Sequence, residues 1–133
     1  MSELLKQHIL VVEDHVDSAN MLTRLLQRNG YEVSVAGNAT DALDAAQSQE
    51  NAGRPLDLLI SDLGLPDASG YELMKKMSER HQIPGIALSG YGEADDVRRA
   101  LEAGFSHHLT KPIDFDKLKA AIDDLLNQTT RPS

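Results

Sequence analysis

Five residues of the sequence carry groups that could take part in one reaction, and each follows a short apolar run: Glu13, Asp14, Asp62, Ser89 and Lys111. If the three carboxylates lie close together, their repulsion must be relieved by protonation or by a hard divalent cation with oxygen ligands. Magnesium is the natural candidate for that cation. The ammonium group of Lys111 and the hydroxyl group of Ser89 could stabilise charge on a transferring phosphoryl group, with Asp62 as the nucleophile.

These side chains can meet only if the elements before them end at one edge of a sheet. Short apolar runs alternate along the chain with longer segments of helical period, which is typical of βαβ units around a parallel sheet. The predicted strands are residues 9–12, 31–36, 56–60, 86–88 and 105–110, and a helix should follow each of them. The first run is continuously apolar, as in a central strand covered on both faces, whereas residues 31–36 alternate and indicate an edge strand.

Several residues mark where the helices should begin or end. The expected caps and stops are Gly30, Asn38, Ser69, Gly104 and Asp114. The first helix should bury Val16 and Leu25, and the fourth should bury Leu101, because these residues follow the helical period. Residues 47–55 are polar and contain a glycine and a proline, so a surface loop is expected there.

Five strands and five helices without an internal repeat fit one doubly wound layer sandwich. We expect an α/β, flavodoxin-like (βα)5 fold with a parallel sheet in the strand order 2-1-3-4-5. In such sheets the ligand lies outside the carboxyl ends of the strands, at the switch point between the first and third. The expected fold therefore brings the reactive side chains to one place.

Length and composition narrow the class of protein. A chain of 133 residues with 41% hydrophobic residues has room for one domain with a buried core. We expect a single domain over residues 1–133, with its core at about 7–127 and a tail that frays from residue 127. The net charge of −8 disfavours direct nucleic-acid binding, and the absence of cysteine excludes disulfides and thiolate catalysis. Lacking a recognisable signal peptide or membrane span, the protein is expected to be cytoplasmic.

Four short motifs stand at the predicted strand ends: Glu13-Asp14, Asp62-Leu63-Gly64-Leu65-Pro66, Ser89-Gly90 and Lys111-Pro112. In this order, and over nearly the whole chain, they resemble the receiver domains of two-component response regulators. The resemblance implies that Asp62 accepts a phosphoryl group from a phosphohistidine of a sensor histidine kinase or a histidine phosphotransfer protein. It also implies that Glu13, Asp14, Asp62 and the Gly64 carbonyl hold Mg²⁺.

The same resemblance gives the remaining residues their roles. Lys111 should contact the phosphoryl group, and Ser89 should move to hydrogen-bond it, changing the face formed by the fourth helix and fifth strand, where a downstream protein binds. Such a domain is not an enzyme for other molecules and catalyses only its own phosphorylation and dephosphorylation. His108 occupies the position where the family usually has an aromatic residue that reports the switch, which leaves its role open.

The other histidines receive no functional role. We expect His8, His15 and His81 on the surface at the ends of elements, and the sequence shows no partner for them. His107 and His108 are adjacent on a strand, so their side chains should point to opposite faces and cannot both bind one metal ion.

The same residues disfavour two other functions. A phosphatase of the haloacid dehalogenase type would need a second acid where Gly64 stands, and a flavodoxin-like cofactor binder would need a phosphate loop where Glu13 and Asp14 would repel phosphate. Two alternatives stay open. The chain could be a receiver that acts only by docking, or a receiver excised from a hybrid sensor histidine kinase, whose sequences residues 87–92 resemble.

Overall fold

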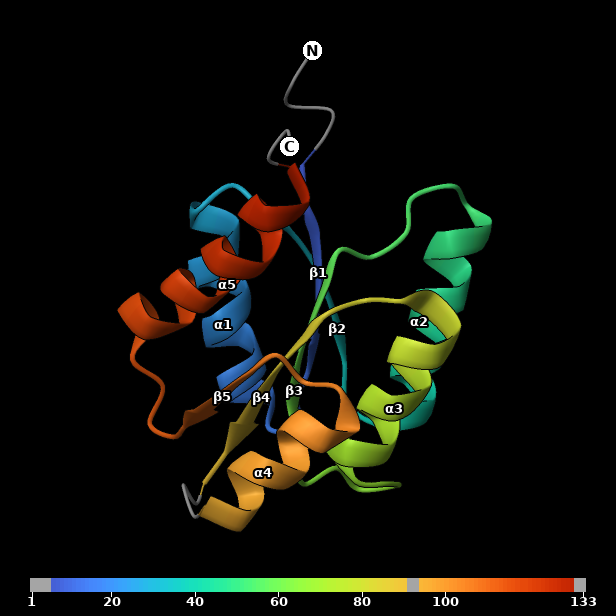
Figure 1. The fold of residues 1–133 in the computed structure, drawn as a ribbon. Coiled ribbons are helices and arrows are strands. Elements are labelled where there is room, and N and C mark those ends of the chain that lie inside the picture. The colour runs from blue at the N-terminus through green and yellow to red at the C-terminus, as the bar shows by residue number, and fades with distance from the viewer. Residues whose placement is uncertain (1–5, 91–93, 131–133) are drawn as a thin grey trace.

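A computed structural model describes residues 6–90 and 94–130, without the side chains of residues 94, 95 and 127–130 (Figure 1). The five strands are β1 (His8–Val12), β2 (Glu32–Ala36), β3 (Leu58–Asp62), β4 (Gly85–Ser89) and β5 (His107–Thr110). The helices are α1 (Val16–Arg28), α2 (Ala39–Asn51), α3 (Gly70–His81), α4 (Ala94–Ala103) and α5 (Phe115–Thr130). All strand pairs are parallel, and the order β2-β1-β3-β4-β5 confirms the predicted topology.

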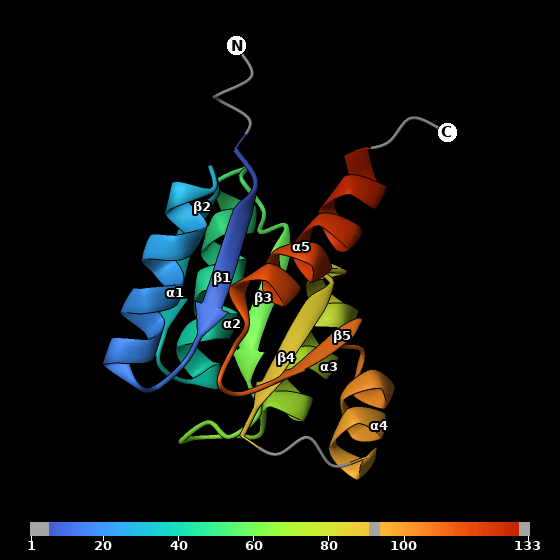
Figure 2. The same cartoon turned by 90° about the vertical axis from the view of Figure 1, so that its left-hand side faces the viewer.

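The sheet lies between two layers of helices. Helices α1 and α5 cover one face, and α2, α3 and α4 lie on the other (Figures 1 and 2). Every residue of β1, β3 and β4 is buried, whereas β2 is only partly buried, as expected of an edge strand. None of the helices in the described parts of the chain has the length and apolar character needed to cross a bilayer.

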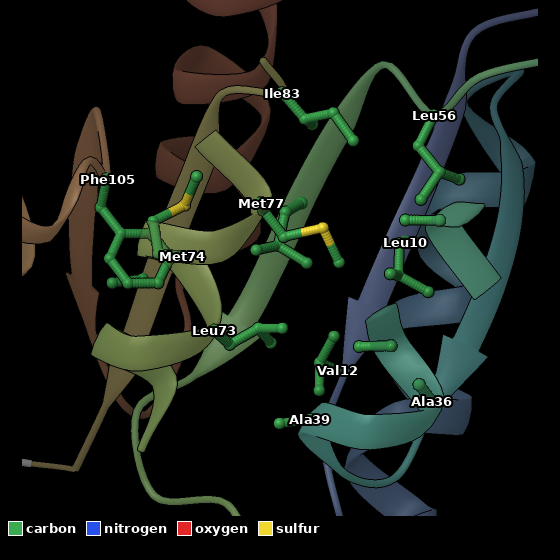
Figure 3. Close-up of a cluster of buried hydrophobic side chains, with 14 of the residues drawn as sticks. Leu10, Val12, Ala36, Ala39, Leu56, Leu73, Met74, Met77, Ile83 and Phe105 are labelled. Atoms are coloured by element: carbon green, nitrogen blue, oxygen red, sulfur yellow. The ribbon is translucent and has the colours of Figure 1, made fainter. Parts of the chain in front are cut away.

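Each face of the sheet has its own apolar cluster. Ile9 and Val11 of β1 pack in the cluster beneath α1 and α5, while Leu10 and Val12 pack in the other. This division follows from the alternation of side chains along a strand. Figure 3 shows the second cluster, in which the side chain of Met74 lies beside Phe105. Burial on both faces holds the central strands, and therefore their carboxyl ends, in fixed positions.

The caps and stops that the sequence predicts are present. The Asn38 side chain accepts a hydrogen bond from the backbone of Asp41 at 2.8 Å, and Ser69 caps α3 in the same way. At the start of α5, Asp114 Oδ1 accepts the backbone N–H of Asp116 at 2.9 Å. Gly104 directly after α4, and Gly30 after the Asn29 C-cap of α1, have positive φ angles, a conformation that favours glycine.

Several boundaries differ from the expectations. Helix α2 continues to Asn51, so the first half of the predicted 47–55 loop is helical. Strand β3 extends to Asp62, which pairs with Leu88 of β4. Helix α5 extends to Thr130, beyond Leu126, the last apolar residue of the predicted helix. In each case the segment is polar, and the apolar pattern used for the prediction carries no signal there.

Two apolar residues that the helical period predicts to be buried are exposed. Val16 and Leu101 are 70% and 52% exposed, and Leu25 is only partly buried. Val16 is the first residue of α1, and the buried residues of this helix are Ala19, Leu22 and Leu26. The apolar period therefore predicts these helices but not every contact that they make.

His8 is buried, which corrects the expectation of a surface residue. Its Nε2 shares a hydrogen bond of 2.6 Å with the hydroxyl group of Ser34, and its Nδ1 has no hydrogen-bond partner among the described residues. Burial lowers the pKa of His8 below its ordinary value of 6.5. The negative charges of Glu32 and Asp57 act in the opposite direction, and the positive charge of Arg54 lowers the pKa further.

The lowered pKa of His8 predicts acid-sensitive stability. The folded state binds this proton less readily than the unfolded state, so the contribution of His8 is fully present above pH 6.5 and falls as the pH drops toward the lower, folded pKa. Urea unfolding from about pH 7.5 to about pH 5 should show the decline, and His8→Gln should reduce it. An unchanged pH dependence in His8→Gln would contradict the prediction.

Candidate functional site

The carboxyl ends of the parallel strands meet at one edge of the sheet, as the arrowheads of β1 and β3 show in Figure 2. Glu13 follows β1, Asp62 and Ser89 are the last residues of β3 and β4, and Lys111 follows β5 by one residue. Strand pairing aligns these ends, because Asp62 pairs with Leu88 and Ser89 pairs with Thr110. The structure thus brings together residues that the sequence separates by up to 98 positions.

Lys111 joins two buried carboxylates. Its Nζ donates to Asp62 Oδ2 at 2.9 Å and to Glu13 Oε1 at 3.1 Å. Glu13 and Asp62 are only 3% and 8% exposed, so the ammonium group neutralises charge where water cannot do so fully. Partial burial lowers the pKa of Lys111, but the hydrogen bonds and charges of Asp62 and Glu13 together outweigh it, and the pKa is raised. Lys111 is therefore a permanent cation beside Asp62.

The site contains an acidic cluster. Glu13, Asp14, His15 and Asp62 each offer one ligand atom, and these atoms lie within 4.8 Å of one another. Three carboxylates at this spacing are the oxygen donors that Mg²⁺ prefers, so the residues present fit the expected cation. The backbone N–H of Gly64 donates to Asp62 Oδ1 at 3.2 Å, which places the Gly64 backbone beside the cluster.

His15 is part of this cluster, and the structure gives it partners that the sequence does not show. Its Nδ1 lies 3.2 Å from Glu13 Oε2 and 3.4 Å from Asp14 Oδ1. The hydrogen bond to Glu13, followed by the charges of Asp14 and Glu13, raises the pKa of His15. Its position directly after two acids was the available signal. His81 also has a partner, Glu50 Oε1 at 3.0 Å.

The carboxylate repulsion predicts that Asp14→Asn stabilises the metal-free protein. Removing one of three neighbouring negative charges should raise the free energy of unfolding by about 1 kcal/mol, the scale of one close charge pair in water. Urea unfolding in a chelator measures this gain. With Mg²⁺ added, the wild type should gain stability and Asp14→Asn should gain less, because it has lost a ligand. A variant less stable than the wild type in the chelator would refute this account.

Ser89 is held by the residue whose role the sequence left open. Its Oγ shares a hydrogen bond of 2.8 Å with Nε2 of His108 on β5. His107, the preceding residue, instead lies 2.9 Å from Asp124 of α5 through its own Nε2. The two rings thus contact different elements, as expected of neighbours on a strand. A histidine at position 108 can bond the Ser89 hydroxyl group directly.

The loop after Asp62 is fixed at both ends. The backbone N–H of Gly70 donates to the Leu63 carbonyl at 2.8 Å, and Gly64 and Ser69 form an isolated antiparallel bridge. A Cβ atom at Gly70 would lie 2.5 Å from the Asp62 carbonyl oxygen, so only glycine fits. No sequence motif had indicated a role for Gly70 or Asp67.

Asp67 attaches this loop to another helix. Its carboxylate accepts hydrogen bonds from the backbone N–H groups of Ala39 and Thr40 and from the Thr40 hydroxyl group. These hydrogen bonds lower the pKa of Asp67 to about 2, and the bond from Ala39 has the largest effect. In the sequence Asp67 is one acid in a turn after Pro66, and nothing nearby indicates its partner.

Comparison with known proteins gives one consistent result. The family model described as the response regulator receiver domain matches residues 9–123. Sporulation initiation phosphotransferase F of Bacillus subtilis is 30% identical over 124 residues, covering 92% of this chain and 96% of that protein. The response regulator protein PilR of Pseudomonas aeruginosa is 33% identical over 118 residues, covering 88% of this chain but 25% of PilR. A crystal structure of a putative response regulator from Chloroflexus aurantiacus has a TM-score of 0.80 and 29% identity, covering 92% of this chain and 98% of that one.

Proposed function

The chain belongs to the response regulator receiver domain family, and from this we propose that it accepts a phosphoryl group on Asp62 within a phosphorelay. One observation carries the proposal. The Asp62 carboxylate stands at the end of β3 with Lys111 Nζ at 2.9 Å from one oxygen and the Gly64 N–H at 3.2 Å from the other. The carboxylate is thereby oriented for attack, and a cation lies beside it that can stabilise the charge on the phosphoryl oxygens.

The transfer that we propose forms one bond and breaks one. A carboxylate oxygen of Asp62 bonds to phosphorus as the P–N bond of the donor phosphohistidine breaks, and the released imidazole keeps the bonding electron pair. Lys111 pairs with a phosphoryl oxygen, and Ser89 donates its hydroxyl hydrogen to another. Glu13, Asp14, Asp62 and the Gly64 carbonyl would hold Mg²⁺, which when bound supplies further positive charge to the phosphoryl oxygens.

The proposed partners follow from the family. Response regulators receive phosphate from histidine kinases. We propose a sensor histidine kinase or a histidine phosphotransfer protein as the donor here, and a downstream protein that reads the face of α4 and β5. The net charge of −8 argues against direct nucleic-acid binding. We also propose that residues 1–133 form one domain with its core at about 7–127, which catalyses only its own phosphorylation and dephosphorylation.

Intact mass spectrometry after incubation with Mg²⁺ and acetyl phosphate tests the proposal. The expected result is a single phosphate adduct that disappears when the metal is chelated. A protein that binds Mg²⁺ but gains no adduct would be a receiver selective for its protein donor, which a phosphorylated histidine donor would then have to label. A protein that neither binds Mg²⁺ nor gains an adduct would favour a receiver that acts only by docking.

His108→Phe is expected to speed phosphorylation by acetyl phosphate. Phenylalanine cannot bond the Ser89 hydroxyl group, so turning that group toward the phosphoryl group no longer breaks the 2.8 Å bond. A neutral hydrogen bond contributes about 1 kcal/mol, which corresponds to a rate increase of about fivefold. The rate of adduct formation measures the effect, with His107→Phe as the control on the same strand. Equal rates in the wild type and His108→Phe would show that this bond does not restrain Ser89.

A further inference from the structure

The loop between β3 and α3 is bound to a helix that precedes it in the chain. Asp67 Oδ1 accepts the backbone N–H of Ala39 at 2.8 Å, and Oδ2 accepts the backbone N–H and hydroxyl group of Thr40 at 2.9 and 2.8 Å. Ala39 and Thr40 are the first two residues of α2, whose N–H groups have no partner within the helix. The negative charge also suits the positive end of the helix dipole.

Helix α2 has a second cap that does not involve the loop. The Asn38 side chain accepts the N–H of Asp41 at 2.8 Å, which is the ordinary capping contact for a helix that begins at residue 39. The two caps thus differ in one respect. Both satisfy N–H groups at the start of α2, but only Asp67 belongs to the loop that carries Gly64.

The contacts of Asp67 complete the attachment of that loop. Its ends are joined by the bond from Gly70 to Leu63 and by the bridge between Gly64 and Ser69. Leu63, Leu65 and Ala68 pack partly against the apolar cluster beneath α2 and α3. Among the described residues, Asp67 supplies the hydrogen bonds that join the tip of the loop to a separate element. Asp67, at the tip of the loop, is only a few residues from Gly64, which pairs with Ser69 in the bridge.

We propose that Asp67 is a positioning residue for the proposed Mg²⁺ site. Its hydrogen bonds join the loop to α2 and so hold the Gly64 backbone beside the Asp62 carboxylate. The inference rests on the proposed function, in which the Gly64 carbonyl and Asp62 hold Mg²⁺. Partners of metal ligands commonly change metal affinity by about 10-fold or more when they are removed. Asp67→Ala should therefore weaken Mg²⁺ binding by about 10-fold.

Asn38→Ala provides the matched control. It removes the other cap of the same helix, so it should lower the melting temperature without loosening the loop. A Mg²⁺ titration followed by the backbone amide signal of Gly64 in two-dimensional NMR reports binding at the loop itself. We expect wild-type affinity in Asn38→Ala and weaker binding in Asp67→Ala, with Asp67→Asn between them, because the amide keeps one acceptor oxygen.

Three results would overturn part of this account. Equal Mg²⁺ affinity in Asp67→Ala and the wild type would show that Asp67 only stabilises the fold. An equal loss in Asn38→Ala would show that affinity follows the stability of α2, not the attachment of the loop. If the wild type itself binds no Mg²⁺, the proposed function is wrong and the inference about Asp67 is wrong with it. The first two results differ from this one, because in them the wild type still binds Mg²⁺. Should Asp67→Ala not fold, Asp67→Asn gives the same comparison.

Discussion

Asp62→Asn is expected to abolish the phosphate adduct that the wild-type protein gains from Mg²⁺ and acetyl phosphate. The amide oxygen of asparagine is a poor nucleophile, and the amide cannot form the acyl phosphate. The loss should be complete, because no other carboxylate of the described site is held by both Lys111 and the Gly64 N–H. Intact mass spectrometry of the two proteins, treated in parallel, gives the result directly.

Asp57→Asn is the matched control for this experiment. Asp57 lies just before the other end of β3, where its Oδ2 accepts the backbone N–H of His8 at 2.8 Å. Its substitution tests whether any change of charge near the strand affects labelling. An adduct that persists in Asp62→Asn would mean that another residue is the acceptor, and the assignment of Asp62 would be wrong.

Lys111→Met is expected to slow phosphorylation by about 100-fold or more, the scale seen when one preorganised donor is removed from a developing negative charge. Methionine keeps much of the length of the side chain but carries no charge. Lys111 Nζ adjoins both Asp62 and Glu13, so its removal also leaves two buried carboxylates without their cation. The rate of adduct formation at a fixed Mg²⁺ concentration measures the functional loss.

The same substitution should lower the free energy of unfolding by about 3–5 kcal/mol, the cost of breaking a buried ion pair by removing one partner. Lys119→Met is the control, because Lys119 is an exposed lysine on α5 that lies 3.4 Å from Asp123. Its loss should change neither rate nor stability by much, since surface ion pairs contribute little. Labelling of Lys111→Met at the wild-type rate would remove Lys111 from the proposed mechanism.

The topology and most of the site could be predicted from the sequence, because both depend on the same local pattern. A polar residue directly after an apolar run marks the carboxyl end of a buried strand, and parallel strands bring such ends together. Glu13, Asp62 and Ser89 were found in this way, and the structure places all three at one edge of the sheet. Their chemical roles came from residue type and from the family resemblance.

The contacts that the sequence did not reveal join elements far apart in the chain. Asp67 bonds the start of α2, 28 and 27 residues earlier, and His8 meets Ser34 across neighbouring strands. Neither residue stands in a periodic or motif context that indicates its partner. Polar helix ends were missed for a related reason, since residues 47–51 extend α2 without adding an apolar position. Such features depend on tertiary packing, which local patterns do not encode.

The two oxygens of Asp62 are attached to opposite layers of the molecule. Oδ1 accepts the N–H of Gly64, in the loop that leads to α3, and Oδ2 accepts the ammonium of Lys111, in the segment that leads to α5. When one oxygen becomes bonded to phosphorus, the carboxylate charge is lost from both: the bonded oxygen becomes a poor acceptor, and the other becomes a neutral carbonyl oxygen that can still accept. Modification of this one side chain therefore weakens the hydrogen bonds to the two helical layers unequally, and most at the oxygen that carries phosphorus.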